Sequence, residues 1–137
     1  MPQYLPDATF GQVRNISAAQ TASSGMEAVV MNTFHLMQKP GASTVKSLGG
    51  LHQMTGWKKA IFTDSGGFQA YSLIRQNPRY GSMNENGIVF IPEDGKRKHQ
   101  LTPEKCMQLQ VSFGSDVVFC LDDCTHIDDP LAEQEKS

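Results

Sequence analysis

Residues 60–69 read Ala-Ile-Phe-Thr-Asp-Ser-Gly-Gly-Phe-Gln: an apolar run stops at Asp64, and the chain then passes through two glycines. A short continuous apolar run is typical of a strand buried on both faces of a parallel sheet. In sheets of this kind, ligands bind beyond the carboxyl ends of the strands. We therefore expect Asp64 to lie where an α/β protein places its functional groups.

The same pattern occurs twice more along the chain. Residues 28–31 are apolar and end at Asn32, and residues 117–121 are apolar and end at Asp122. Asn and Asp often end strands for local reasons alone, but three such ends in succession favour convergence on one face. We expect Asn32 and Asp122 to lie beside Asp64.

A helix is predicted over residues 103–113, directly before the third apolar run. Thr102 can cap its start, Pro103 suits its first turn and Gly114 can end it. Its apolar face comprises Cys106, Leu109 and Phe113. A helix, a glycine and a buried strand in succession form half of a βαβ unit.

An antiparallel hairpin is predicted between the second and third runs. Asp-Gly at residues 94–95, a tight-turn signal, separates the strand-like residues 87–91 and 98–101. We interpret this hairpin as an insertion between β/α elements. Near the end of the sequence, Asp-Asp-Pro at residues 128–130 predicts the start of one more helix.

The composition is that of a folded globular protein: 39% of the residues are hydrophobic and 19% are charged. A chain of 137 residues fits one domain with a real core. Three cysteines without paired spacing argue against a disulfide framework. The first residues contain no leader-like apolar run, and no run approaches the roughly twenty residues of a membrane span. We expect a cytoplasmic protein with no membrane partner.

The formal net charge of −2 gives no argument for a nucleic-acid partner, so any such contact must be local. The best local candidate is the basic run Lys96, Arg97 and Lys98, which follows the predicted hairpin turn. These side chains can contact phosphates, and they can equally form a solvated hairpin tip.

The run Asp64-Ser65-Gly66-Gly67 also surrounds the nucleophile of chymotrypsin-like proteases. That triad needs a histidine, then an acid, then the serine in chain order. No Asp or Glu lies between His35 and Asp64, so the order is not met. We reject a serine protease.

A different division of labour fits the two strand-end carboxylates. One of Asp64 and Asp122 can move protons while the other stays ionised and accepts hydrogen bonds. Gly66 and Gly67 remove side chains where the backbone turns and where a flat ligand would approach. Phe68 can stack on a purine-like base, although a core position is the alternative.

A metal site around Asp122 is not expected. Cys120, Cys124 and His126 follow no common zinc spacing. Cys120 falls inside the third apolar run, where a cysteine usually serves as a small buried apolar residue.

Several blocks in register resemble one enzyme family. The blocks cover residues 32–37, 39–41, 48–52, 56–57, 63–69, 101–105, 114–116 and 122–125. Their order and spacing are similar to those of the tRNA-guanine transglycosylases from about Tyr4 to Asp129. The resemblance implies an amino-terminal portion of a (β/α)8 TIM barrel with an inserted antiparallel hairpin. It also implies exchange of guanine in tRNA for a 7-deazaguanine base, a step of queuosine biosynthesis, through a covalent ribosyl-enzyme intermediate.

The resemblance gives roles to individual residues. Asp64 matches the general acid/base that acts on the leaving and entering bases. Asp122 matches the carboxylate that recognises the base's amino and ring N–H groups, and Phe68 matches the ring stacked on the base. The other substrate-binding candidates are Ser65, Gly66, Gly67, Gln69, Cys124 and Asn32. The partners implied are tRNA, with Lys96, Arg97 and Lys98 as contacts, and guanine or a 7-deazaguanine.

In the family, the nucleophilic aspartate and a zinc site of three cysteines and a histidine lie beyond the matched positions. We therefore expect residues 1–137 to be a partial barrel domain truncated before both. We expect no cofactor within this chain and no activity of the chain alone. Residues 123–126 read Asp-Cys-Thr-His where the family commonly has Glu-Cys-Thr-Pro, which indicates a divergent branch.

Two other functions are compatible with the residues. The chain could be a non-catalytic base-binding module or a partner subunit, because it lacks the family nucleophile. Two carboxylates on a barrel could also hydrolyse glycosides, but that does not explain the matched blocks.

An open barrel edge would in addition favour a homo- or hetero-oligomer.

Overall fold

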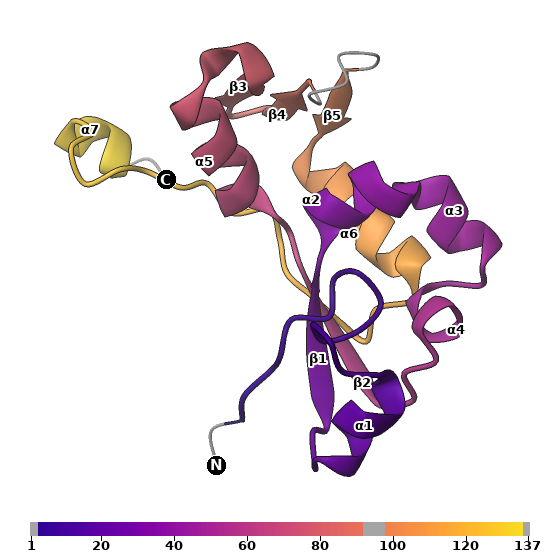
Figure 1. The fold of residues 1–137 in the computed structure, drawn as a ribbon. Coiled ribbons are helices and arrows are strands. Elements are labelled where there is room, and N and C mark those ends of the chain that lie inside the picture. The colour runs from indigo at the N-terminus through magenta and orange to yellow at the C-terminus, as the bar shows by residue number, and fades with distance from the viewer. Residues whose placement is uncertain (1–2, 92–97, 136–137) are drawn as a thin grey trace.

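The structure, a computed structural model, describes residues 3–91 and 98–135. Its first sheet has three parallel strands in the order β1-β2-β6 (Figure 1). The strands are β1 (Ala28–Asn32), β2 (Ala60–Asp64) and β6 (Val117–Val118). The register pairs Asn32 with Asp64, so the first two strands end side by side.

Short helices precede and connect these strands. They are α1 (Ala18–Ser23), α2 (Thr33–Leu36), the π-helical turn η1 (Met37–Gly41), α3 (Ala42–Ser47) and α4 (Leu51–Thr55). In Figure 1, α3, α4 and α6 lie on the same side of β1 and β2. The core between them is apolar and includes Met31, Val45, Leu51, Ile61 and Phe113.

Helix α6 (Pro103–Phe113) confirms the predicted helix. The Thr102 hydroxyl accepts a hydrogen bond from the N–H of Lys105 at 3.2 Å, and Gly114 ends the helix with a φ of 75°. Its buried face contains Cys106 and Phe113, as the spacing predicts.

A second, antiparallel sheet has the order β3-β4-β5. Its strands are β3 (Gly81–Asn84), β4 (Gly87–Phe90) and β5 (His99–Leu101), and α5 (Gly67–Gln76) reaches it through the 3-10 turn η2 (Pro78–Tyr80). The β4–β5 pair confirms the predicted hairpin, whose Asp-Gly turn lies outside the described residues. Strand β3 was not predicted, although Asn-Gly at residues 86–87 is a hairpin signal.

A second apolar cluster joins this sheet to the rest of the chain. Its buried members include Phe34, Ala70, Ile88, Phe90, Leu101 and Cys106. The rings of Phe34 and Phe90 are 4.7 Å apart at 66°, an edge-to-face contact between α2 and β4. The small sheet is therefore fixed near the carboxyl ends of β1 and β2 (Figure 1).

The third apolar run forms a shorter and more exposed strand than predicted. Only Val117 and Val118 are in β6, and the exposed fraction is 38% for Val117 and 51% for Phe119. Cys120 is also exposed, so its prediction as a buried apolar residue is wrong. These residues are exposed because β6 is an edge strand of the described sheet. It pairs with β2 on one side and with no described strand on the other.

The described residues thus form a mixed α/β fold with one parallel and one antiparallel sheet. The short helix α7 (Leu131–Gln134) confirms the helix expected after residues 128–130. Within residues 3–91 and 98–135, no helix has the length and apolar character needed to cross a membrane.

Candidate functional site

The turn between β2 and α5 carries the first group of predicted site residues. Asp64 ends β2, Ser65 and Gly66 form the turn, and Gly67 is the first residue of α5. Gly66 has a φ of 77°, and a Cβ there would lie 2.9 Å from the backbone nitrogen of Phe34. Glycine is required here because of the positive φ and because the turn packs tightly against the start of α2.

Asp122 lies directly against this turn. The Ser65 hydroxyl donates a hydrogen bond to Oδ1 of Asp122 and accepts one from the N–H of Gly67 at 3.0 Å. The Cys124 thiol donates to Oδ2 of Asp122 at 3.0 Å. A Cβ on Gly67 would lie 2.8 Å from Cγ of Asp122. The space at Gly67, predicted to admit a flat ligand, is thus taken by the Asp122 carboxylate.

Asn32 lies beside Asp64 as predicted, and the structure gives it a local role. Its Oδ1 accepts a hydrogen bond from the N–H of His35 at 3.0 Å and caps α2. Its own backbone N–H donates to Oγ1 of Thr9 at 2.9 Å. The side-chain oxygen is therefore already committed, and a substrate contact by Asn32 stays a prediction.

Asp64 is poised to change its protonation state near neutral pH. Burial raises the pKa of Asp64 to about 6, and the negative charges of Asp122 and Asp7 add to this effect. The N–H groups of Gly66 and Thr33 offset it only in part. Among the described residues, Oδ1 of Asp64 is buried without a hydrogen-bond partner, which favours the neutral acid.

Asp122 is held in the opposite state. Burial alone would raise the pKa of Asp122, but hydrogen bonds from Ser65, Cys124 and backbone N–H groups outweigh it and lower the pKa below 3.8. Burial and the Asp122 carboxylate raise the pKa of the Cys124 thiol to about 12, so it stays a donor. The two carboxyl groups thus differ in their protonation chemistry.

Phe68 is 57% exposed on α5, so the alternative of a core aromatic is wrong. Its ring centroid lies 6.4 Å from that of Tyr71, at 37°. The two rings line an open groove together with Arg75 and His126. Gln69, the next residue on α5, is half-buried. An exposed ring at the start of α5, the helix whose first residue packs against Asp122, suits recognition of a planar ligand.

Comparison with known proteins identifies the family of the chain. The family model described as Queuine tRNA-ribosyltransferase matches residues 1–137. The chain belongs to this family.

Similar relatives carry the same description. The chain is 43% identical over 124 residues to the queuine tRNA-ribosyltransferase of Prochlorococcus marinus, a match that covers 90% of this chain and 32% of that protein. It is 40% identical over 134 residues to the one of Francisella tularensis, which covers 98% of this chain and 35% of the relative. The chain thus spans about a third of the length of these curated relatives.

The remaining predicted contacts of this queuine tRNA-ribosyltransferase family member are only partly described. Lys96 and Arg97 lie outside the described residues, and Lys98 is exposed directly before β5. Within the described part of the chain, no three His, Cys, Asp or Glu side chains form a group that could hold a metal ion. The expectation of a cofactor-free chain stays a prediction, as does the family's zinc site outside the matched positions.

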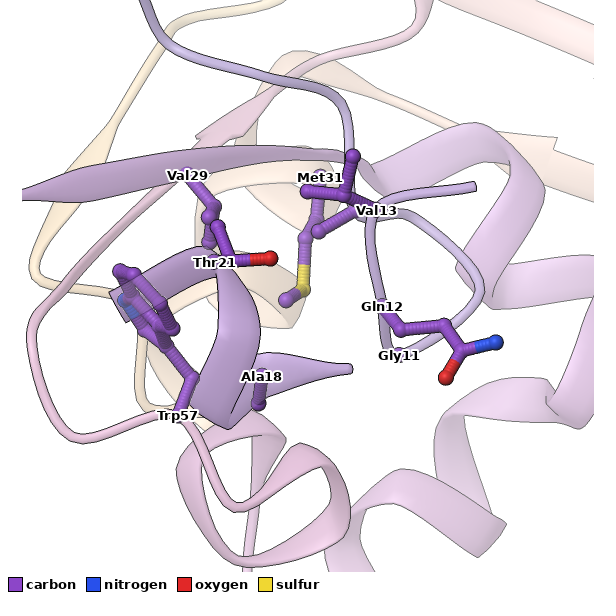
Figure 2. A pocket seen from close by; sticks show the side chains of 9 residues that line it. Gly11, Gln12, Val13, Ala18, Thr21, Val29, Met31 and Trp57 are labelled. Carbon is purple, nitrogen blue, oxygen red and sulfur yellow. The ribbon is translucent and has the colours of Figure 1, made fainter. Parts of the chain in front are cut away.

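A small cavity elsewhere in this family member is not a candidate base site. Figure 2 shows it between α1, β1 and Trp57. Its volume is about 10 Å³, which is room for a single water and too little for a purine. Its lining residues include Val13, Ala18, Thr21, Val29, Met31 and Trp57, and none of the predicted site residues.

Two further residues near the site were not singled out from the sequence. Asp7 adds negative charge near Asp64, and it reaches this place through a β-bridge to Val30 that no sequence pattern signals. Gln110 is completely buried on α6. A signal for Gln110 did exist, because it shares a helical face with Cys106 and Phe113 and is the polar member of that face.

Proposed function

We propose that this chain is the amino-terminal part of a tRNA-guanine transglycosylase, which replaces a guanine in tRNA by a 7-deazaguanine base. The single observation that carries the proposal is the pair Asp64 and Asp122, whose pKa values move in opposite directions. In enzymes, two neighbouring titratable groups whose pKa values differ in this way can serve as the acid and the base of the reaction. Family membership supports the same reaction.

Asp64 is the proton-transfer group of the proposed reaction. Its pKa of about 6 leaves both protonation states accessible near neutral pH. The acid form protonates the leaving guanine as its bond to the ribose breaks. The resulting carboxylate takes the ring N–H proton of the entering base as the new bond to the ribose forms. The nucleophile that holds the ribose in between lies, on this proposal, outside residues 1–137.

Asp122 and Phe68 recognise the base. Because Asp122 stays ionised, it accepts hydrogen bonds from the amino and ring N–H groups of a guanine-like edge. Phe68 stacks on the flat face of the base, a contact worth about 1–3 kcal/mol. The pocket is completed by Ser65, Gln69 and Cys124, and Lys98 contacts tRNA phosphates.

We further propose that residues 1–137 form the first part of a (β/α)8 barrel. The parallel order β1-β2-β6 supports it, because consecutive barrel strands are neighbours in this way. The exposed Val117 and Phe119 support it as well, since further barrel elements would cover them. The antiparallel sheet β3-β4-β5 is then an insertion beside the site.

The test uses the full-length protein that contains this chain, with labelled guanine and tRNA. Asp64→Asn keeps the shape of the side chain and removes its titration, so incorporation of guanine is expected to fall at least a hundredfold. Glu27→Gln is the matched control, because Glu27 is an exposed carboxylate paired with Lys59 directly before β1, at the opposite end of the strand from Asn32. An exchange rate that is unchanged in Asp64→Asn would refute the proposed role.

Base binding without catalysis is the second candidate. It is favoured because this chain contains Asp64 and Asp122, the proposed proton-transfer and base-recognition groups, while the proposed nucleophile lies outside it. Calorimetry of the 137-residue chain with guanine separates the two. Binding that depends on Asp122, with no exchange into tRNA by the full-length protein, would favour the binding module.

A further inference from the structure

The side chain of Gln110 is completely buried on α6, and both ends of its amide are used. Its Oε1 accepts hydrogen bonds from Oγ1 of Thr63 at 2.8 Å and from the N–H of Phe119 at 3.2 Å. Its Nε2 donates to the carbonyl of Phe119 at 2.8 Å and to that of Cys106 at 3.3 Å. A fully satisfied buried amide of this kind fixes the position of the groups that it joins.

The contact with Phe119 resembles pairing with a neighbouring strand. One side-chain amide meets both the N–H and the carbonyl of the same residue. Phe119 follows β6 directly, and its N–H also reaches the carbonyl of Thr63 at 3.1 Å. Gln110 thereby holds the backbone at the residue that directly follows β6, together with the last backbone hydrogen bond to β2. Asp122 follows only three residues later.

The other contacts of Gln110 lead to the opposite carboxylate. Thr63 directly precedes Asp64, and its hydroxyl also lies 2.9 Å from that of Ser115. Cys106 packs below the turn, with its thiol 4.0 Å from the carbonyl of Ser65. The amide therefore touches the strand end that carries Asp64 and the segment that leads to Asp122.

We propose that Gln110 is a positioning residue for the site, which sets the placement of Asp122 relative to Asp64. It touches neither carboxylate and acts through Thr63 on one side and Phe119 on the other. The consequence for base exchange rests on the proposed function, whereas the placement of the two carboxylates does not.

An apolar side chain of similar length would fill the same space and lose the placement. Gln110→Met keeps the volume but leaves the carbonyl of Phe119 without its side-chain donor and Oγ1 of Thr63 with Ser115 alone as its acceptor. The segment from Phe119 to Asp122 is then held by fewer contacts. Asp122 keeps its hydrogen bonds from Ser65 and Cys124, but the backbone that leads to it is less firmly held, so the part of the Asp64 pKa shift caused by its charge becomes smaller.

The test follows the two carboxyl groups by NMR titration in the 137-residue chain. In Gln110→Met, the titration midpoint of Asp64 is expected to fall below about 6 but to stay above 3.8, because burial, the largest cause of the raised pKa, remains. Gln108→Met is the matched control, with the same chemical change at an exposed position of α6, and should leave the midpoint unchanged. Unchanged titration of both carboxyl groups in a folded Gln110→Met protein would overturn the proposal.

A second variant decides the matter if Gln110→Met does not fold. Thr63→Val has nearly the same shape and removes the hydroxyl that reaches Gln110 and Ser115 while leaving the bonds from Gln110 to Phe119 in place, so a smaller fall of the same midpoint is expected. An unchanged midpoint in Thr63→Val would then count against the proposal.

In the full-length protein, Gln110→Met should lower kcat by about ten- to a hundredfold, the cost of a misplacement near 1 Å, with KM for tRNA unchanged. A raised KM for tRNA with an unchanged kcat would contradict a role of Gln110 in the site. If the wild-type protein exchanges no base, the proposed function fails, while the titration still tests the placement.

Discussion

Ser65 and Asp122 are 57 residues apart in the chain, yet the Ser65 hydroxyl donates a hydrogen bond to Oδ1 of Asp122. Ser65 is almost completely buried, at 2% exposed, and it directly follows Asp64. The turn after β2 therefore has two effects. It carries Asp64, whose pKa is raised, and through Ser65 it stabilises the ionised form of Asp122, whose pKa is lowered. The lowered pKa of Asp122 depends in part on this hydroxyl.

Ser65→Ala should weaken base binding. Without the hydroxyl, the pKa of Asp122 rises toward its ordinary value, and the N–H of Gly67 loses its acceptor. A hydrogen bond to a charged group contributes about 1.5–3 kcal/mol, so guanine affinity is expected to fall roughly ten- to a hundredfold. Calorimetric titration measures it, with Ser112→Ala on the exposed side of α6 as the control. Equal affinity in the two variants would contradict the role of Ser65.

Asp64→Asn should stabilise the fold at neutral pH. The pKa of Asp64 is raised from 3.8 to about 6, so the folded state prefers the protonated acid. This group's contribution to stability is present below pH 3.8 and is lost as the pH rises through about 6. Asparagine mimics the neutral acid at every pH. Because Asp64 is partly exposed, solvent screening reduces the gain to about 1 kcal/mol.

Urea unfolding of the wild type and of Asp64→Asn at several pH values measures this gain. The two midpoints should differ at neutral pH and converge below pH 3.8, where the wild-type carboxyl is protonated as well. A difference that stays constant over this range would show that the carboxylate is not destabilised by burial.

Gly67→Ala should displace Asp122 and weaken base binding. Gly67 is the first residue of α5, where its lack of a side chain leaves room for Asp122. The new Cβ would lie 2.5 Å from the backbone carbonyl oxygen of Asp122 and 2.8 Å from its Cγ, so the chain at Asp122 must move away from α5. Guanine affinity should fall more than tenfold, and the free energy of unfolding should fall as well, because a backbone clash cannot be relieved by a side-chain rotation alone. Retained affinity would mean that Asp122 does not need its place against α5.

The sequence predicted the elements whose signals are local. Thr102, Pro103 and Gly114 mark the ends of α6 within a few residues, and the structure confirms both. The convergence of Asp64 and Asp122 was also predictable, because parallel strands carry their ends to one edge. The extent of β6 was not, since the length of a strand depends on its partners and not on its own apolar residues.

The details of the site depend on contacts between distant segments. Nothing around Gly67 in the sequence indicates that Asp122 occupies the space beside it, 55 positions later in the chain. The same holds for Asn32, whose capping of α2 requires the chain to turn into a helix directly after β1. Sequence patterns thus located the site residues, while tertiary packing determined what each one touches.

Isolated residues 1–137 should self-associate through the exposed side of β6. Among the described strands, β6 pairs only with β2, and an uncovered strand edge beside apolar side chains is a site for association. Phe119 is 51% exposed there, so Phe119→Lys should shift sedimentation toward the monomer by placing a charge on this surface. Leu48→Lys is the control, because Leu48 is equally exposed, at 51%, after α3. Wild-type chain that sediments as a monomer at every concentration, with a sharp unfolding transition, would contradict the prediction. Equal loss of association in both variants would place the contact outside β6.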